Sequence, residues 1–180
     1  MKTPVYSLLF LVFLVIAFAC QPQPSVLTDA QKGVIADSAK AVAQQVARGI
    51  EALDGTAVMA RFSPDPDARF LENGFLYASY NAFKDSLVAD FATISTVSYQ
   101  IDASDVVVLG ADAAVITESF HFSVKPKTDE EVKGQGIASL VVQMRNGRWQ
   151  IIQWHESELS PPETEETMSS PTAKEGATKK

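Results

Sequence analysis

Apolar residues recur at steps of three and four along the first patterned part of the chain, which predicts an amphipathic helix. The stripe consists of Val34 or Ile35, Ala39, Val42, Val46, Ile50 and Leu53. A helix of about 25 residues would place these side chains on one face. Thr28-Asp29-Ala30-Gln31 has the form of a capping box, so we expect the helix to begin after Thr28. We expect Asp54-Gly55 to end it, with Gly55 in the left-handed conformation.

Two shorter helices and one short strand are expected next. A helix over 57–62 would follow Thr56 as its cap, and residues 68–72 are typical of a short strand closed by the turn Asn73-Gly74. Ser79 is then placed to cap a third helix. Its expected apolar face consists of Tyr80, Phe83, Leu87, Val88 and Phe91.

After Thr93 the apolar period changes from that of a helix to the two-residue period of strands. The alternation predicts strands over residues 96–102, 105–109, 113–124, 132–145 and 148–156. A bend is expected near Ala103-Ser104, and Asn146-Gly147 predicts a tight hairpin between the last two strands. Helices first and antiparallel strands afterwards indicate an α+β fold, with one bent sheet laid over the helices.

The N-terminus has the layout of an export signal. Lys2 precedes an almost wholly apolar run over 5–19, which is shorter than the roughly 20 residues that span a bilayer. Ala17-Phe18-Ala19-Cys20 resembles a bacterial lipobox, and Cys20 is the only cysteine. We therefore expect Cys20 to be lipidated and the protein to be a membrane-anchored lipoprotein of the bacterial cell envelope, facing the periplasm or the exterior. Secretion without a lipid, or a retained anchor, is the alternative.

These features divide the chain into four parts. Residues 1–19 are expected to be a signal peptide, and 20–27 the lipidated cysteine and an extended tether. Residues 28–158 would form one folded domain. Residues 159–180 are rich in Pro, Thr, Ser, Glu and Lys with almost nothing to bury, which predicts a disordered tail.

The charge balance excludes one class of partner. The chain has 22 acidic and 15 basic residues, a net charge of −7, and no basic cluster within the expected domain. Nucleic acid binding depends on clustered Lys and Arg, so no nucleic acid partner is expected.

The order of elements and motifs resembles the SnoaL-like and nuclear-transport-factor-2-like superfamily. Members have a long and a short helix, then F-[SA]-x-D before a short strand, as in Phe62-Ser63-Pro64-Asp65. After a third helix they end in a strand of the form W-x-I-x-x-x-H-x-S, matched by Trp149, Ile151, His155 and Ser157. The resemblance covers nearly all of 28–158. It implies a cone of three N-terminal helices packed on a curved antiparallel sheet around a pocket.

The resemblance also offers a test for one activity. Ketosteroid isomerases, which belong to this superfamily, use a carboxylate base after the first strand, a tyrosine on the first helix and a protonated acid on the penultimate strand. Glu72 stands near the base position, but no Tyr occurs within 28–54 and no carboxylate within 132–145. A solvent-exposed turn residue is the other interpretation of Glu72.

The remaining candidates are histidines and aromatic residues. His155 is either a general acid or base or a polar residue at a sheet end. The pocket side chains expected from the fold are Phe70, Tyr80, Phe83, Trp149, Trp154 and His121. His121 lies opposite Phe120 and Phe122 in the alternation, and would face either the solvent or the pocket.

Alternation also places Trp149 and Trp154 on opposite faces of the last strand. The hydroxyls of Tyr77, Tyr80 and Tyr99 are expected to reach water. The polar Gln135, Gln143 and Arg145 indicate a partly polar outer sheet face, through which a homodimer could form.

No metal or cofactor site is indicated. The two histidines lack H-x-H or H-x-x-x-H spacing, and Gly134-Gln135-Gly136 precedes no helix that could hold a phosphate. The leading hypothesis is a lipid-anchored envelope domain that binds a small apolar ligand or a protein partner without catalysis. The alternatives are a pocket enzyme of isomerase, cyclase or dehydratase type using Glu72 or His155, and an interaction module that uses its sheet face.

Overall fold

The computed structural model describes residues 26–128 and 130–159. The expected signal peptide, the candidate lipidation site Cys20, most of the tether and the tail from residue 160 onward lie outside the described residues. None of the helices in the described part of the chain is long and apolar enough to cross a bilayer.

The long first helix is confirmed. Helix α2 (Asp29–Glu51) begins with the predicted capping box, in which the Thr28 side chain accepts a hydrogen bond from Gln31 N. The end of the helix differs from the prediction, because Leu53 rather than Gly55 has a positive φ, of 52°. Gly55 is instead the first residue of the next helix, where a Cβ would lie 3.1 Å from Val88 Cγ2.

The second helix is shorter and starts earlier than predicted. Helix α3 (Gly55–Met59) is capped by Asp54, whose side chain accepts a hydrogen bond from Ala57 N at 2.9 Å, so Thr56 is not the cap. Helix α4 (Tyr80–Thr93) begins as expected after Ser79, whose hydroxyl accepts from Ala82 N. Only part of its predicted apolar face is buried: Phe83 lies in the core, whereas Val88 is exposed.

One six-stranded sheet accounts for the strands. Its order is β2-β1-β6-β5-β4-β3, and all pairs are antiparallel except β1 with β6. The strands are β1 (Arg69–Glu72), β2 (Phe75–Leu76), β3 (Ile94–Gly110), β4 (Ala113–Pro126), β5 (Val132–Arg145) and β6 (Arg148–Leu159). The two strands expected over 96–102 and 105–109 are one strand, β3, with a register shift between Ile101 and Ala103, close to the predicted bend.

Both predicted Asn-Gly turns are present. Asn73 and Gly74 join β1 to β2, and Asn146 and Gly147 join β5 to β6, with positive φ at all four residues. Two consecutive residues with positive φ match the right-handed twist of the flanking strands.

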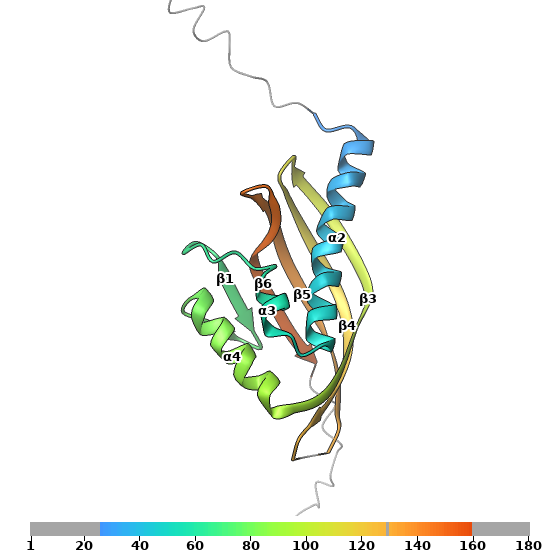
Figure 1. Cartoon of the computed structure of the whole chain (residues 1–180). Helices are drawn as coiled ribbons and strands as arrows, with labels where there is room; N and C mark the ends of the chain where they lie inside the picture. Colours follow the sequence, from blue (N-terminus) through green and yellow to red (C-terminus); the bar gives the residue numbers. More distant parts are fainter. Residues whose placement is uncertain (1–25, 129, 160–180) are drawn as a thin grey trace, which may run out of the picture.

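The sheet curves around the helices, which all lie on one of its faces (Figure 1). We call this the inner face. Its side chains include Ile116, Phe120, Leu140 and Ile151, which are buried against buried residues of α2 and α3. The predicted α+β cone is therefore confirmed.

A bulge in β6 changes which side chains face inward. Val142 pairs with Ile151 but Val141 pairs with Gln153, so Ile152 has no partner in β5. The extra residue reverses the alternation beyond it. Trp154 is consequently on the same face as Trp149, and the prediction that the two tryptophans lie on opposite faces is wrong.

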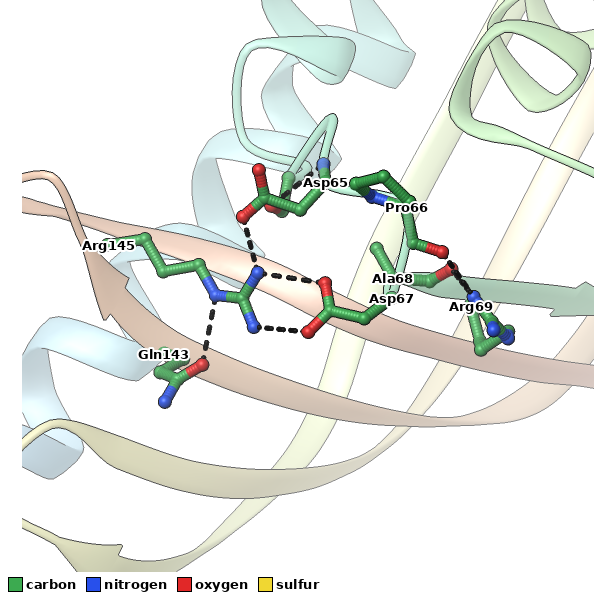
Figure 2. Close-up of polar contacts among 8 residues, drawn as sticks. Asp65, Pro66, Asp67, Ala68, Arg69, Gln143 and Arg145 are labelled. Atoms are coloured by element: carbon green, nitrogen blue, oxygen red, sulfur yellow. Dashed lines mark hydrogen bonds and ion pairs between the residues drawn. The ribbon is translucent and has the colours of Figure 1, made fainter.

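An ion-pair cluster fixes the β5–β6 hairpin to the loop between α3 and β1 (Figure 2). Arg145, at the end of β5, binds both carboxylate oxygens of Asp67 at 3.0 Å and also pairs with Asp65. Its Nε donates to Gln143 Oε1 at 2.9 Å. Because the guanidinium hydrogen bonds hold its charged form, the pKa of Asp67 lies below its usual value.

The two glycines of β5 have a packing role. Gly134 pairs with Phe122 and Gly136 with Phe120, and each phenylalanine ring lies over its glycine partner. A Cβ on Gly136 would lie 2.5 Å from Phe120 Cζ and 2.7 Å from the backbone oxygen of Ser157. The sheet therefore accommodates these rings only because β5 has no side chain at those positions.

We predict that Gly136→Ala lowers the free energy of unfolding by roughly 1–3 kcal/mol, the usual cost of overpacking a core. Urea denaturation of the purified protein measures this. Gly33→Ala is the matched control, because a Cβ there meets nothing within 4 Å and alanine is favoured inside a helix. Equal stability of Gly136→Ala and the wild type would contradict the assigned role of the glycine.

Candidate functional site

A cavity of about 250 Å³ lies between the helices and the inner face of the sheet. Its walls come from the second half of α2, from α3 and the residue Phe62 after it, from α4, and from β1, β3, β4 and β6. The lining is largely aliphatic and aromatic, with Phe62, Phe83 and Trp154 among its rings. An apolar concavity with a few polar groups is the usual form of a small-molecule site.

The polar lining of this cavity is acidic apart from one tyrosine. Glu72, Asp90, Glu156 and Glu158 line it together with Tyr99. No Lys, Arg or His within 26–128 or 130–159 is part of the lining. The cavity therefore combines apolar walls with four carboxyl groups.

Three acidic residues lie in one row across the inner face. Glu72 of β1 is the register partner of Glu156 in β6, and Glu156 is the partner of Ala138 in β5. Ala138 in turn pairs with Glu118 of β4. The small side chain of Ala138 separates two buried glutamates, Glu118 with 2% and Glu156 with 7% of its surface exposed.

Burial disfavours the charged form of both glutamates and so raises their pKa values. Removal from water raises the pKa of Glu156 to about 8, and the charges of Glu72, Glu158 and Glu118 add to this rise. Burial alone raises the pKa of Glu118 to about 7, and its Oε2 atom has no hydrogen-bond partner. Glu156 is therefore largely protonated at neutral pH, when a carboxylic acid can donate a hydrogen bond.

Tyr99 of β3 brings a hydroxyl to the same cavity. The side chain stacks on Phe120 with ring centroids 4.8 Å apart and is 7% exposed. Its hydroxyl is buried without a hydrogen-bond partner, so the expectation that it reaches water is wrong. Burial, followed by the charges of Glu156 and Glu118, raises the pKa of Tyr99 far above its usual value.

Glu72 is held at the cavity by a second tyrosine. The Tyr77 hydroxyl donates a hydrogen bond of 2.7 Å to Glu72 Oε2. Burial raises the pKa of Glu72, and the bond from Tyr77 opposes that rise. Burial is also the main reason why the pKa of Tyr77 rises to about 12. Glu72 is thus a partly buried cavity residue rather than an exposed turn residue.

Only some of the predicted pocket residues line the cavity. Phe83 and Trp154 line the cavity, together with Glu72. Phe70 and Tyr80 pack behind it: Phe70 stacks on Phe83 at 5.1 Å between ring centroids, and the Tyr80 hydroxyl donates to the backbone oxygen of Met59. Trp149 packs on the core on the other side of the bulge and is not part of the lining.

Neither histidine faces the cavity. His155 is exposed on the outer sheet face, because the inward positions next to it are taken by Trp154 and Glu156. His121 is also exposed, and its Nδ1 lies 2.7 Å from Asp102 Oδ1 on the neighbouring strand. The placement of His121 in the pocket and of His155 as a catalytic group therefore does not agree with the structure.

A second, wider groove of about 650 Å³ runs between α2 and the edge strand β3. It is lined by side chains of both charges, including Lys40, Arg48, Glu51 and Asp102. Glu51 Oε1 accepts a long hydrogen bond of 3.4 Å from Tyr99 N, which satisfies one backbone group at the sheet edge. Tyr99 lines both spaces, but only the apolar cavity also contains the buried Glu156 and the partly buried Glu72, so we assign the candidate site to that cavity.

A SnoaL-like domain model matches residues 39–161, most of the chain. The protein belongs to the SnoaL-like domain family. Its fold is similar to a nuclear transport factor 2-like superfamily protein from Salmonella enterica serovar Typhimurium, with a TM-score of 0.64, 20% identity, and coverage of 78% of this chain and 99% of that one. No curated protein matches the sequence.

A ketosteroid isomerase-like protein from Erwinia carotovora atroseptica also has this fold, with a TM-score of 0.60 and 19% identity, covering 70% of this chain and 97% of that chain. Identities this low establish the architecture alone. The chemistry of this SnoaL-like domain must be argued from its own cavity.

Tyr99 and Glu156 are the two most buried polar residues of the SnoaL-like cavity, and neither was predicted to line it. Alternation did contain a signal for Glu118, which shares the parity of Phe120 and Phe122. Glu156 gave no such signal, because its inward orientation depends on the bulge at Ile152. The tyrosine that lines the cavity comes from β3 rather than from the first helix, and the two buried glutamates lie on β4 and β6 rather than on β5.

We predict that Glu156→Gln stabilises the protein at alkaline pH. The folded-state pKa of about 8 exceeds the value of 4.5 for an unperturbed glutamate, so stability is lost as the pH rises between these values. Glutamine needs no proton, and the variant should gain a few kcal/mol over the wild type at pH 8.5 and little at pH 4.5. Thermal melts across this pH range measure the difference.

Glu130→Gln is the control, because Glu130 is exposed in the loop before β5. An identical pH dependence of melting in Glu156→Gln and the wild type would show that Glu156 does not carry a proton in the fold.

Proposed function

We propose that this domain binds a small, largely apolar molecule in the cavity of its cone, as a lipid-anchored protein of the bacterial cell envelope. The observation that carries the binding proposal is the Tyr99 hydroxyl, which is buried in the cavity wall without a partner. A buried polar group without a hydrogen bond costs about 1–3 kcal/mol. A ligand that meets this hydroxyl while covering the apolar walls would recover that cost.

Cavity size and composition narrow the class of ligand. A volume of about 250 Å³ lies just below the usual range of ligand pockets, which suits a molecule with one ring or a short chain. The rings of Phe62, Phe83 and Trp154 favour an aromatic or aliphatic body, and the acidic residues favour one polar end.

A second candidate is an enzyme that moves a proton next to a carbonyl group. Three groups in the cavity favour it: Glu72 as the base, with the Tyr99 hydroxyl and protonated Glu156 as hydrogen-bond donors to the carbonyl oxygen. Glu72 would take a proton from the carbon beside the carbonyl and return it to another carbon, so that a double bond shifts. His155, the other catalytic candidate, is on the wrong face for this chemistry.

We predict that 2-phenylethanol binds in the cavity and changes the fluorescence of Trp154. The chain has two tryptophans, so Trp149→Phe leaves Trp154 as the only one and as a reporter inside the cavity. In that background, Val97→Phe should fill part of the cavity and weaken binding at least tenfold. Val107→Phe adds the same ring to the exposed part of β3 and is the control.

Unchanged binding in Val97→Phe would refute the cavity as the ligand site. Conversion of a β,γ-unsaturated ketone to its conjugated isomer by the purified chain, abolished by Glu72→Gln, would instead favour the enzyme over the non-catalytic binding protein. Conjugation is followed directly by ultraviolet absorbance.

Localisation is tested through Cys20. We predict that Cys20→Ala abolishes lipidation and releases the protein from the membrane fraction, because the candidate lipobox ends at this cysteine. Metabolic labelling with a fatty acid analogue and fractionation of the cells measure both effects. Cys20→Ala that remains labelled and membrane-bound would contradict the lipoprotein assignment.

A further inference from the structure

The charge of the cavity points to the charge of its ligand. Glu72 and Glu156 are neighbours across β1 and β6, and Glu158 follows on β6. Asp90, on α4, lines the same cavity from the helical side. Carboxyl groups therefore lie on both sides of one space, with apolar walls between them.

The fold does not neutralise these groups. Within the described part of the chain, no salt bridge joins a Lys, Arg or His to any of the four carboxylates. Their mutual repulsion is visible in the pKa of Glu156, raised by burial and then by Glu72, Glu158 and Glu118. The pKa of Glu72 also shows this repulsion. Burial raises it most, the hydrogen bond from Tyr77 lowers it, and the charges of Glu158 and Asp90 raise it further.

A second observation is independent of the acidic residues. Tyr99, which is only 7% exposed, lines the cavity, and its buried hydroxyl has no hydrogen-bond partner. A phenol oxygen accepts hydrogen bonds, so it can receive one from an N–H donor that the carboxylates also attract. The faces of nearby rings, such as Phe83 and Trp154, attract cations as well.

We propose that the ligand of this cavity is an organic cation, a molecule with an ammonium group on a small apolar body. This rests on the proposed function. The ammonium group is placed among Glu72, Glu156 and the Tyr99 hydroxyl, and the apolar body lies against Phe83 and Trp154. In the described residues no three Asp, Glu, His or Cys side chains are arranged to hold a metal ion. The apolar walls beside the carboxyl groups fit an amine with an apolar body instead.

Binding of a cation is coupled to loss of a proton. The groups that face Glu156 are Glu72 from β1, Glu158 from β6, Glu118 from β4, Asp90 from α4 and Tyr99 from β3, while α2 contributes apolar side chains. None of these is a cation, so an ammonium group would reverse the sign of the local field and lower the pKa of Glu156. Near neutral pH the amine should therefore displace a proton from that residue.

Three probes of similar size test the proposal: 2-phenylethylamine, the neutral 2-phenylethanol and the anion 3-phenylpropionate. Calorimetry on the full chain at pH 7.5 and low salt is expected to show the amine binding at least tenfold more tightly than the alcohol, with no binding of the anion. Repeating the titration in buffers of different ionisation enthalpy should reveal protons released with the amine and none with the alcohol.

Variants then locate the cation. Glu72→Gln and Glu156→Gln should each weaken the amine at least fivefold and leave the alcohol unchanged, and Glu156→Gln should also abolish proton release. Exposed Glu130→Gln should change neither. Misfolding does not confound Glu156→Gln, since retained binding of the alcohol reports an intact cavity.

The outcomes separate this inference from the proposed function. If the alcohol binds as tightly as the amine, or the two Gln variants bind the amine normally, the ligand is not a cation, although the cavity remains a binding site. If none of the three probes binds, the proposed function falls together with the inference.

Discussion

Ile152, the one residue in the middle of β6 without a partner in β5, decides what the cavity contains. Up to Ile151 the inward positions of β6 are Trp149 and Ile151, and beyond the bulge they are Trp154 and Glu156. Regular alternation would instead have turned Gln153 and His155 inward. The apolar wall and the buried acid of the site thus depend on a single inserted residue.

The chain before β1 supports this irregularity. Ile151 N donates to the backbone oxygen of Arg61 and Ile151 O accepts from Ser63 N, both at 2.8 Å. The loop after α3 therefore satisfies the backbone of β6 next to the bulge. Two residues beyond Ile151, β1 takes over as the parallel neighbour, with Arg69 opposite Gln153. Arg145 holds the following part of that loop through Asp65 and Asp67 (Figure 2).

The sequence was a good guide where structure is local. Asn-Gly turns and the Thr28 capping box require particular residues at adjacent positions, so they could be located to the residue. Strand β5 was predicted with its correct ends, because a charged loop precedes Val132 and the Asn146-Gly147 turn follows Arg145. The positive φ of Leu53 was not predicted, because leucine rarely adopts this conformation and its own preference gives no sign of it.

The candidate site was much less predictable, because its parts meet only through pairing between distant strands. Tyr99, Glu156 and Glu72 come from three strands. Alternation with Val97 and Ile101 does mark Tyr99 as an inward residue, but nothing within β6 or β1 marks Glu156 or Glu72 as buried. The isomerase pattern, which has its tyrosine on the first helix, indicated only Glu72 in this sequence. A tyrosine and a buried acid do line the cavity, but they come from β3 and β6, elements that the isomerase pattern does not use for them.

Burial of carboxyl groups also limits what the cavity can do. Glu156 lies beneath helices rather than in water, so its free carboxylate is unstable and it holds a proton near neutral pH. A neutral ligand leaves that proton in place and uses Glu156 as a hydrogen-bond donor, whereas a cation removes it and uses the anion. One side chain therefore serves either kind of ligand. Its proton removes Glu156 from the repulsion, whereas the repulsion that remains among Glu72, Glu158 and Asp90 is relieved by the cation and not by the neutral ligand. That difference in free energy, rather than the shape of the cavity, is what would select a charged ligand over its neutral isostere.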